Sequence, residues 1–254
     1  MSSPHTQETP AAVERLTPYG TGGKTAQIRR AFDTIAPGYD RLNRLLSLGL
    51  DLSWRRRALR EARLPQHAKI LDVATGTGDF ALEAARRFPD ADVTGVDLSE
   101  AMLESARRKF ADAGCASRLR LIAGDILETS LPLASFDLVT AAFGVRNFAD
   151  IAAGLRKMAA LLKPGGTLLV LELSRPRSPL VSVPYTFYLR VWMPFLGRLL
   201  TGHAAEYRYL PASIEAVPQG EAMLRLFAEA GLAAPRFERY TLGVCSAYFG
   251  AAPL

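Results

Sequence analysis

Short apolar segments alternate with helical patterns along the chain from residue 69 to residue 173. The apolar segments predict strands at residues 69–74, 92–98, 119–123, 136–142 and 167–173. The segments between them predict helices at residues 80–88, 100–113 and 151–162. A β-α-β-α alternation needs crossover connections, so the strands lie parallel in one sheet and the helices cover both faces. The chain is therefore predicted to adopt a doubly wound α/β fold.

The last part of the chain departs from this alternation. Residues 221–230 predict a helix, and residues 236–242 and 244–249 predict two strands on either side of Gly243. Strands this close in sequence pair antiparallel. We therefore expect a seven-stranded, mostly parallel sheet with one antiparallel strand near its edge.

Helical segments outside the alternation complete the predicted organisation. Residues 1–23 are rich in Ser, Thr, Pro and Gly and predict a flexible tail. Residues 24–254 are expected to form a single domain. It would add N-terminal helices at residues 24–64, and a helical insertion at residues 178–216, to the sheet.

Composition limits the class of protein. Hydrophobic residues make up 49% of the 254 residues and charged residues 22%, which is typical of a globular domain. The two cysteines form no C-x-x-C pair and the start lacks an apolar stretch, so a cytoplasmic protein is expected. The three histidines have no metal-ligand spacing, so no metal is predicted. The net charge of +6 fits either simple solubility or attraction to anionic lipid or nucleic acid.

The turn after the first predicted strand carries two glycines. Gly76 and Gly78 let the backbone turn tightly and approach a ligand closely. This turn lies at the carboxyl edge of the sheet, where open α/β folds bind ligands. Asp97 ends the second strand about 20 residues later, which suits a carboxylate that accepts hydrogen bonds from both ribose hydroxyls of a nucleoside.

The charges around this turn decide between two cofactors. The glycines also fit the G-x-G-x-x-A fingerprint of nicotinamide dinucleotide sites. Asp72 and Asp79 surround the turn with carboxylates, which repel a pyrophosphate and attract the ammonium and sulfonium of S-adenosylmethionine. Asp125, after the third strand, adds an acceptor for an adenine amino group. S-adenosylmethionine is the predicted cofactor, although Asp79 also fits a helix cap and Asp72 a structural carboxylate.

The same strand-end residues resemble those of the class I methyltransferases, whose fold is Rossmann-like. Four further segments resemble a narrower family, the ubiquinone/menaquinone biosynthesis C-methyltransferases. These are FDTIAPGYD at 32–40 with Asn43 and Trp54, FGVRNF at 143–148, KPGG at 163–166 leading into LELSRP at 171–176, and YRYLPASI at 207–214. The resemblance covers residues 25–250, and FGVRNF is its most specific segment.

This resemblance implies methyl transfer to a ring carbon of a prenylated quinol or phenol. Demethylmenaquinol is the expected substrate, because the segment at 193–197 is similar to that of menaquinone-type relatives, and a ubiquinol precursor also fits. The resemblance places cofactor contacts at Thr77, Asp97, Asp125 and Ile126. Two positions depart from the family: Ala142 stands where relatives often have Ser, and the last strand lacks a His that relatives often carry.

The residues after the fourth strand suit chemistry on such a ring. A quinol carbon becomes nucleophilic when the neighbouring hydroxyl loses its proton. The guanidinium of Arg146 would stabilise the phenolate or orient a water that acts as base, and Asn147 would fix that geometry. Tyr39 would complete the hydrogen bonds if the N-terminal helices fold over the site. The alternatives are a surface salt bridge for Arg146 and a packed core aromatic for Tyr39.

The prenyl tail of such a substrate requires an apolar surface, because each buried CH₂ contributes ~0.8 kcal/mol. The insertion at 178–216, expected over the substrate site, carries a block of bulky side chains: Tyr185, Phe187, Tyr188, Val191, Trp192, Met193, Phe195 and Leu196. These would line a tail tunnel, touch the membrane or simply pack a helix. The predicted partners are the quinol and the inner face of a membrane, with no nucleic acid, and a homodimer and a monomer are both compatible with the sequence.

Three other functions are disfavoured. A nicotinamide-dependent oxidoreductase, the chief alternative, would be expected to show a hydride-transfer motif such as Tyr-x-x-x-Lys. A nucleic-acid methyltransferase usually carries Asn/Asp-Pro-Pro-Tyr after the fourth strand, where this chain has AFGV. A non-enzymatic quinone-binding protein would not need the intact glycine turn or Arg146.

Overall fold

The computed structural model describes residues 23–192 and 204–254. Residues 1–22 of the predicted tail, and Met193, Phe195 and Leu196 of the apolar block, lie outside the described residues. Among the described residues, no helix is both long and apolar enough to cross a membrane.

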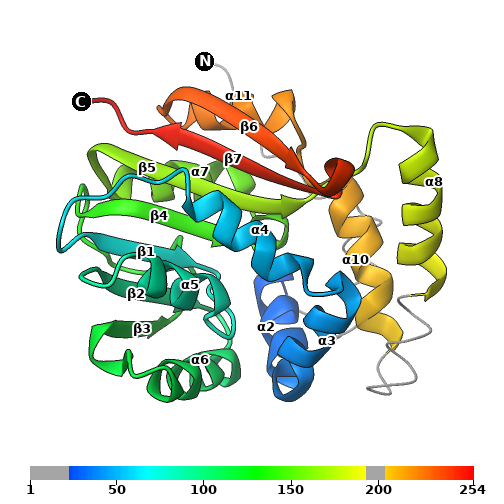
Figure 1. Ribbon diagram of the computed structural model, residues 1–254, viewed down its shortest axis with the longest axis horizontal. Coiled ribbons are helices and arrows are strands. Elements are labelled where there is room, and N and C mark those ends of the chain that lie inside the picture. The colour runs from blue at the N-terminus through cyan, green and yellow to red at the C-terminus, as the bar shows by residue number, and fades with distance from the viewer. Residues whose placement is uncertain (1–22, 193–203) are drawn as a thin grey trace.

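A seven-stranded sheet forms the centre of the molecule, in the order β3-β2-β1-β4-β5-β7-β6 (Figure 1). The strands are β1 (Lys69–Val73), β2 (Asp92–Asp97), β3 (Leu119–Ala123), β4 (Phe136–Ala142), β5 (Leu162–Leu173), β6 (Ala233–Tyr240) and β7 (Cys245–Ala251). The first five strands pair parallel with one another, and β7 pairs antiparallel with both β5 and β6. The predicted doubly wound, mostly parallel sheet with one reversed strand near its edge is confirmed.

The predicted start of the fifth strand at residue 167 is wrong, because β5 begins at Leu162. Helix α7 (Ile151–Leu161) ends one residue before β5 begins, and the Lys-Pro-Gly-Gly segment lies inside β5. Phe136 of β4 pairs with Leu162, and Leu138 pairs with Thr167, so four residues of β5 bulge out opposite one residue of β4. Proline cannot donate to a sheet ladder, and a bulge accommodates it.

Helices cover both faces of the sheet, so alternate residues of each strand enter two separate cores. Ile70 packs on the face covered by α4 (Leu50–Leu59), α5 (Asp79–Arg87) and α6 (Glu100–Asp112), together with Phe80 and Phe110. Leu71 packs on the opposite face, which is covered by α7 and α11 (Glu221–Glu229). The Ser99 hydroxyl caps α6 by accepting a hydrogen bond from Met102 N at 3.1 Å.

A further group of helices lies beyond the carboxyl ends of the parallel strands (Figure 1). It comprises α2 (Lys24–Ile35), the 3₁₀ turn η1 (Ala36–Gly38), α3 (Tyr39–Ser47), α8 (Pro179–Phe187), the π-helical segment η4 (Tyr188–Trp192) and α10 (Ala204–Ala216). The N-terminal helices and the later helices thus meet at the edge where a ligand would bind.

Candidate active site

A cleft opens at the carboxyl ends of β1, β2 and β4. It lies beside the switch point of the sheet, where the chain crosses from the β1-β2-β3 side to β4. Of the predicted site residues, six line it: Tyr39, Gly76, Asp97, Asp125, Ile126 and Asn147. Four do not: Asp72, Thr77, Gly78 and Arg146.

The two glycines of the turn serve different purposes. Gly76 has φ +56°, and a Cβ built on it would meet nothing within 4 Å, so its backbone faces the open cleft. Gly78 has φ +81°, and a Cβ there would lie 2.9 Å from the Cβ of Ala106 in α6. Gly76 therefore leaves room for a ligand, whereas Gly78 lets α5 and α6 pack closely.

Asp72 lies beneath the turn and outside the cleft. Its carboxylate is buried and accepts hydrogen bonds from the hydroxyls of Thr75 and Thr140, each at 2.6 Å. Burial raises the pKa of Asp72 to about 6, although these two hydrogen bonds oppose the rise. Any influence of Asp72 on a cofactor would therefore pass through the turn that it anchors.

Asp97 joins the turn to the start of α6. One carboxylate oxygen accepts from Gly76 N at 2.7 Å, and the other accepts from Ser99 N at 2.9 Å. Burial raises the pKa of Asp97, while these backbone N–H groups favour the ionised form. Each oxygen retains a lone pair for a second donor, as a ribose diol would supply.

Asp125 and Ile126 form the wall next to β3. The Asp125 carboxylate accepts from Leu127 N at 3.0 Å, and the hydroxyl of Thr25 approaches its other oxygen to 3.5 Å. Thr25 belongs to α2, so this carboxylate lies where the N-terminal helix covers the cleft. The Ile126 side chain, only 4% exposed, supplies an apolar surface beside it.

The loops after β1 and β4 touch at the middle of the cleft. Ala74 has φ +53° and Phe143 has φ +59°, values that non-glycine residues rarely adopt. A Cβ on Gly144 would lie 2.5 Å from the Cβ of Ala74, so the two loops approach as closely as a glycine permits. Strained backbone of this kind concentrates at functional sites.

Arg146 lies behind the cleft in a buried ion pair. It occupies the 3₁₀ turn η3 (Val145–Asn147), and its Nη1 donates to Glu172 Oε2 at 3.0 Å and to the carbonyl of Phe143. Glu172 Oε1 accepts from the backbone N of Arg146 at 3.1 Å. The side chains are 8% and 2% exposed, so the alternative of a surface salt bridge is wrong.

Tyr39 faces this arginine from α3. Burial raises the pKa of the Tyr39 hydroxyl, and a hydrogen bond with Asn43 and the charges of Arg146 and Arg55 oppose that rise. Tyr39 therefore keeps its proton at neutral pH in a positive electrostatic field. Asn147, one residue after Arg146, lines the same cleft.

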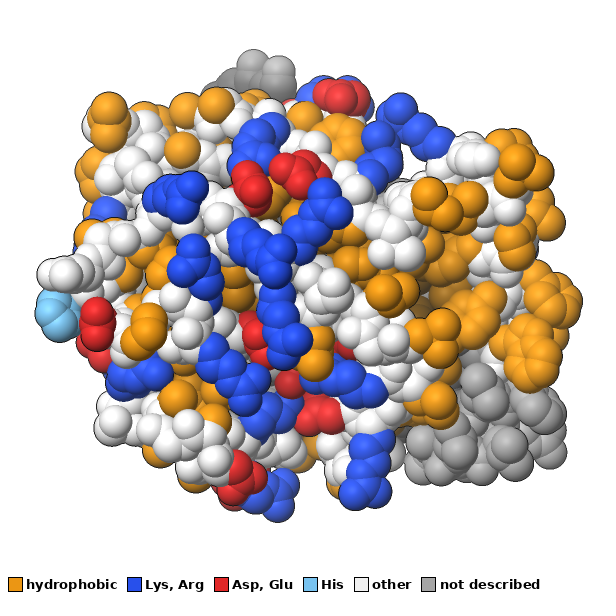
Figure 2. Space-filling view, in the orientation of Figure 1, with side chains coloured by type: hydrophobic (Ala, Val, Ile, Leu, Met, Phe, Trp, Pro, Cys, Tyr) orange, Lys and Arg blue, Asp and Glu red, His pale blue; other side chains and the backbone are white. Residues whose placement is uncertain are grey.

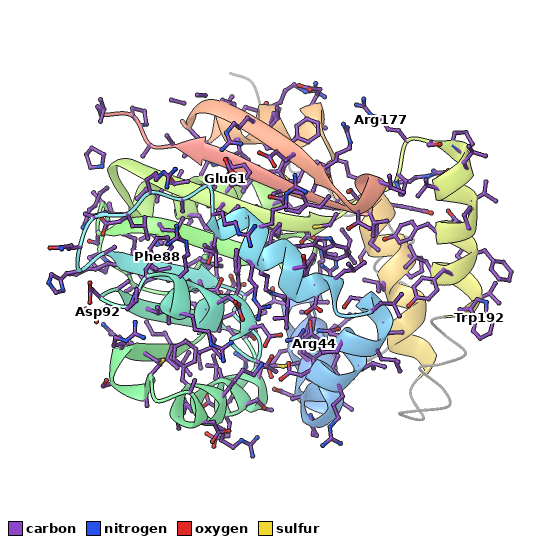
Figure 3. All side chains as sticks on the ribbon, viewed as in Figure 1. Arg44, Glu61, Phe88, Asp92, Arg177 and Trp192 are labelled. Atoms are coloured by element: carbon purple, nitrogen blue, oxygen red, sulfur yellow. The ribbon has the colours of Figure 1, made fainter. Side chains whose placement is uncertain are left out.

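Thr77 and Asp79 belong to a charged network outside the cleft. Thr77 donates to Asp40 at 2.5 Å, and Asp79 accepts from Lys109 at 2.5 Å and from Arg44 of α3, labelled in Figure 3, at 2.7 Å. Burial alone would raise the pKa of Asp79, but these neighbouring cations hold it below its usual value. The network ties α3 to α5 and α6.

Three residues of α2 were not recognised as cleft residues from the sequence: Thr25, Ile28 and Phe32. Their spacing of three and four residues places them on one helix face, and this pattern was the available signal. Glu172 was also missed, because a carboxylate in an apolar strand gives no indication of its partner.

Comparison with known proteins identifies the family. The family model described as the ubiE/COQ5 methyltransferase family matches residues 21–252.

This chain belongs to the ubiE/COQ5 methyltransferase family.

Relatives match the chain over most of its length. A protein named demethylmenaquinone methyltransferase from Thermus thermophilus is 45% identical over 222 residues, which cover 87% of this chain and 100% of the relative. One of the same name from Bacteroides fragilis is 40% identical over 237 residues, covering 92% and 96%. A ubiquinone/menaquinone biosynthesis C-methyltransferase from Geotalea daltonii is 40% identical, covering 89% and 97%.

Solved structures show the same fold. A putative methyltransferase complexed with the Trm112 activator of Haloferax volcanii has a TM-score of 0.64 at 20% identity, covering 88% of this chain and 98% of that one. A SAM-dependent methyltransferase from Aquifex aeolicus has a TM-score of 0.58 at 17% identity, covering 82% and 92%. The class I methyltransferase fold is thus confirmed.

The cleft suits the cofactor of this family, S-adenosylmethionine. Its described lining includes two carboxylates, those of Asp97 and Asp125, and neither lysine nor arginine. Such a lining favours a cationic ligand and offers no counter-charge to a pyrophosphate. The ubiE/COQ5 methyltransferases are S-adenosylmethionine-dependent, and the alternative of a nicotinamide-dependent oxidoreductase is not supported.

Proposed function

We propose that this chain transfers a methyl group from S-adenosylmethionine to a ring carbon of demethylmenaquinol, giving menaquinol. The observation that carries this proposal is the near full-length match to relatives named demethylmenaquinone methyltransferase. Asn147 and Tyr39, which line the cleft, and the buried guanidinium of Arg146 behind it support the proposal, because a quinol requires groups that accept and stabilise charge.

The cofactor would be held by the residues around the cleft. Asp97 would accept from the ribose hydroxyls, Asp125 and Ile126 would bind the adenine, and the backbone of Gly76 would face the amino-acid end. Bound there, S-adenosylmethionine supplies an electrophilic methyl group.

The chain's own residues would generate the nucleophile. As the quinol hydroxyl loses its proton, negative charge grows on the oxygen next to the accepting carbon. The guanidinium of Arg146, fixed by Glu172, would stabilise that charge or hold a water that takes the proton. Asn147 would orient the oxygen, and Tyr39, kept protonated by burial, would donate a hydrogen bond to it.

A peripheral membrane contact would give access to the prenyl tail. α8 and η4 expose large apolar side chains: Leu180 is 88%, Val183 68% and Phe187 56% exposed. In Figure 2 hydrophobic side chains gather on the side of the molecule where Figure 1 draws α8, and Lys and Arg side chains form a column nearer the middle of the same face. We propose that the described helices of the insertion at 178–216, namely α8, η4 and α10, lie over the substrate site, and that α8 and η4 touch the inner face of the membrane.

The direct test is methyl transfer from labelled S-adenosylmethionine to two quinols, demethylmenaquinol and a demethylated ubiquinol precursor, with product mass measured. We expect a product heavier by one methyl group from demethylmenaquinol. Transfer to the ubiquinol precursor alone would replace the proposed substrate, and transfer to neither would contradict the proposed function.

A further inference from the structure

Two tyrosines lie one turn apart on the outer helical wall beyond the strands. Tyr185 lies in the last turn of α8, and Tyr188 is the first residue of η4. Both pack against an apolar cluster formed by Leu42, Leu189 and Ile214, which come from α3, η4 and α10. Both rings therefore belong to the apolar packing that joins α3, η4 and α10 beyond the carboxyl ends of the strands.

The two tyrosine hydroxyls differ in their hydrogen bonds. The Tyr188 hydroxyl donates to the carbonyl of Leu46 at 2.7 Å and so ties η4 to α3. The Tyr185 hydroxyl is buried, and no group among the described residues forms a hydrogen bond with it. A buried hydroxyl without a partner is costly, and such groups in native proteins commonly meet a ligand or a water.

Arg146 links this hydroxyl to the proposed chemistry. Burial raises the pKa of Tyr185, the nearby Cys245 adds to the rise, and the charge of Arg146 opposes it. The same guanidinium acts on Tyr39 at the cofactor cleft. Arg146 is therefore an electrostatic neighbour of one tyrosine at the cleft and of another on α8.

We propose that the Tyr185 hydroxyl donates a hydrogen bond to the quinol oxygen farther from the methyl-accepting carbon. This inference rests on the proposed function. The two oxygens of a 1,4-quinol lie on opposite sides of the ring, so residues at the cleft reach only the nearer one. A donor on α8 would pair the farther oxygen, and the chain would thereby select rings that carry both oxygens.

The geometry makes a distinctive prediction for Tyr185→Phe. Removing a hydroxyl that has no partner among the described residues should leave the melting temperature unchanged or raise it, because none of the described hydrogen bonds is lost. The same change should weaken binding of a short-tailed demethylmenaquinol about tenfold, as for one lost hydrogen bond to a buried ligand oxygen.

The test compares two ligands under anaerobic conditions with S-adenosylhomocysteine bound. One is a short-tailed demethylmenaquinol, and the other is the matched naphthol that lacks the farther hydroxyl. We expect Tyr185→Phe to lose about tenfold in affinity for the quinol and less than about twofold for the naphthol. Equal losses for both ligands, or no loss for either, would overturn the inference.

Two variants serve as controls. Tyr240→Phe also removes a buried hydroxyl with no hydrogen-bond partner among the described residues, but its ring packs under Arg57 of α4, so it should change neither affinity. Tyr188→Phe should lower the melting temperature, because it breaks the hydrogen bond to the carbonyl of Leu46.

A wild-type protein that methylates no quinol overturns the proposed function and this inference together. A wild-type protein that methylates demethylmenaquinol, with Tyr185→Phe binding as tightly, overturns this inference alone.

Discussion

At the scale of single residues, Asp97 holds the cleft together through both of its carboxylate oxygens. Asp97→Ala should weaken S-adenosylhomocysteine binding at least tenfold, because hydrogen bonds to a charged acceptor contribute about 1.5–3 kcal/mol each. Isothermal titration measures this affinity. Asp92→Ala, at the exposed opposite end of β2 (Figure 3), is the matched control and should bind normally. Unchanged affinity in Asp97→Ala would remove Asp97 from the cofactor site.

Arg146 should matter to the reaction far more than to cofactor binding. Arg146→Ala should lower kcat by about 10²–10³, as for the loss of one electrostatic stabiliser, with cofactor affinity nearly intact. Arg146→Lys should restore little, because lysine lacks the planar fork that meets Glu172. Single-turnover methyl transfer at saturating cofactor measures the effect.

Stability must be separated from chemistry at this position. Arg146→Ala leaves Glu172 buried without its counter-charge, which costs about 3–5 kcal/mol of unfolding free energy. The double variant Arg146→Met/Glu172→Gln removes both charges. It should regain much of the lost unfolding free energy, while its kcat for methyl transfer stays low. A double variant that is stable and fully active would exclude Arg146 from the mechanism.

Asp72 should give the protein a characteristic pH dependence of stability. Its pKa is about 6 in the folded chain and near 3.8 in the unfolded chain, so the folded state binds the proton more tightly. This stabilisation is complete below pH 3.8 and is lost as the pH rises through 6, by up to about 3 kcal/mol. In Asp72→Asn the loss between pH 5 and pH 8 should be smaller, as measured by urea unfolding. Identical pH profiles would mean that Asp72 titrates normally.

The sequence located cleft residues where backbone position alone decides. Asp97 and Gly76 line the cleft because one ends a strand and the other occupies the turn at the same edge of the sheet. Thr77 lies outside the cleft, and its hydroxyl donates a hydrogen bond to Asp40 of α3. This partner is 37 positions away in the sequence, so no local sequence pattern predicts it.

At the scale of elements, α2 covers the cleft, and Lys24 fixes its first turn. Lys24 Nζ donates to the carbonyl of Phe148 at 2.7 Å and to that of Arg146 at 3.3 Å, which fixes the start of α2 to η3. Lys24→Met should loosen this cover and speed S-adenosylhomocysteine dissociation about three- to tenfold, as measured by stopped-flow fluorescence. Arg108→Met, on the exposed side of α6, should leave the rate unchanged. Equal rates in both variants would mean that α2 stays closed without Lys24.

Strands and helices were predictable because both faces of the sheet are covered. Continuous apolar runs mark the strands, and β3 and β4 begin and end where the pattern predicted. The start of β5 was not predictable, since Pro164 and two glycines normally indicate a break. Pairing between Phe136 and Leu162 extends the strand across that segment.

At the scale of the whole molecule, the apolar side formed by α8 and η4 should bind membranes. Sedimentation with vesicles containing phosphatidylglycerol should show wild-type binding. The double variant Val183→Ser/Phe187→Ser should bind at least about tenfold more weakly, because each exposed apolar side chain contributes about 1.5–3 kcal/mol when buried. Leu133→Ser is the control. Leu133 is an exposed leucine just before the amino end of β4, whereas α8 and η4 lie beyond the carboxyl ends of the strands. Equal binding by all three proteins would place the membrane contact elsewhere.

The reversed strand β7 has a consequence for how the molecule is made. Among the described residues β6 pairs with β7 alone, and β7 pairs with both β6 and β5, so β7 is inserted between two strands that precede it in the sequence. During synthesis on the ribosome, β1 to β5 can assemble as they appear, but β6 has no strand to join until β7 follows it. A nascent chain arrested before residue 245 should therefore expose the open edges of β5 and β6. A stop codon at position 245 would therefore deprive the sheet of two strands, β7 and its partner β6.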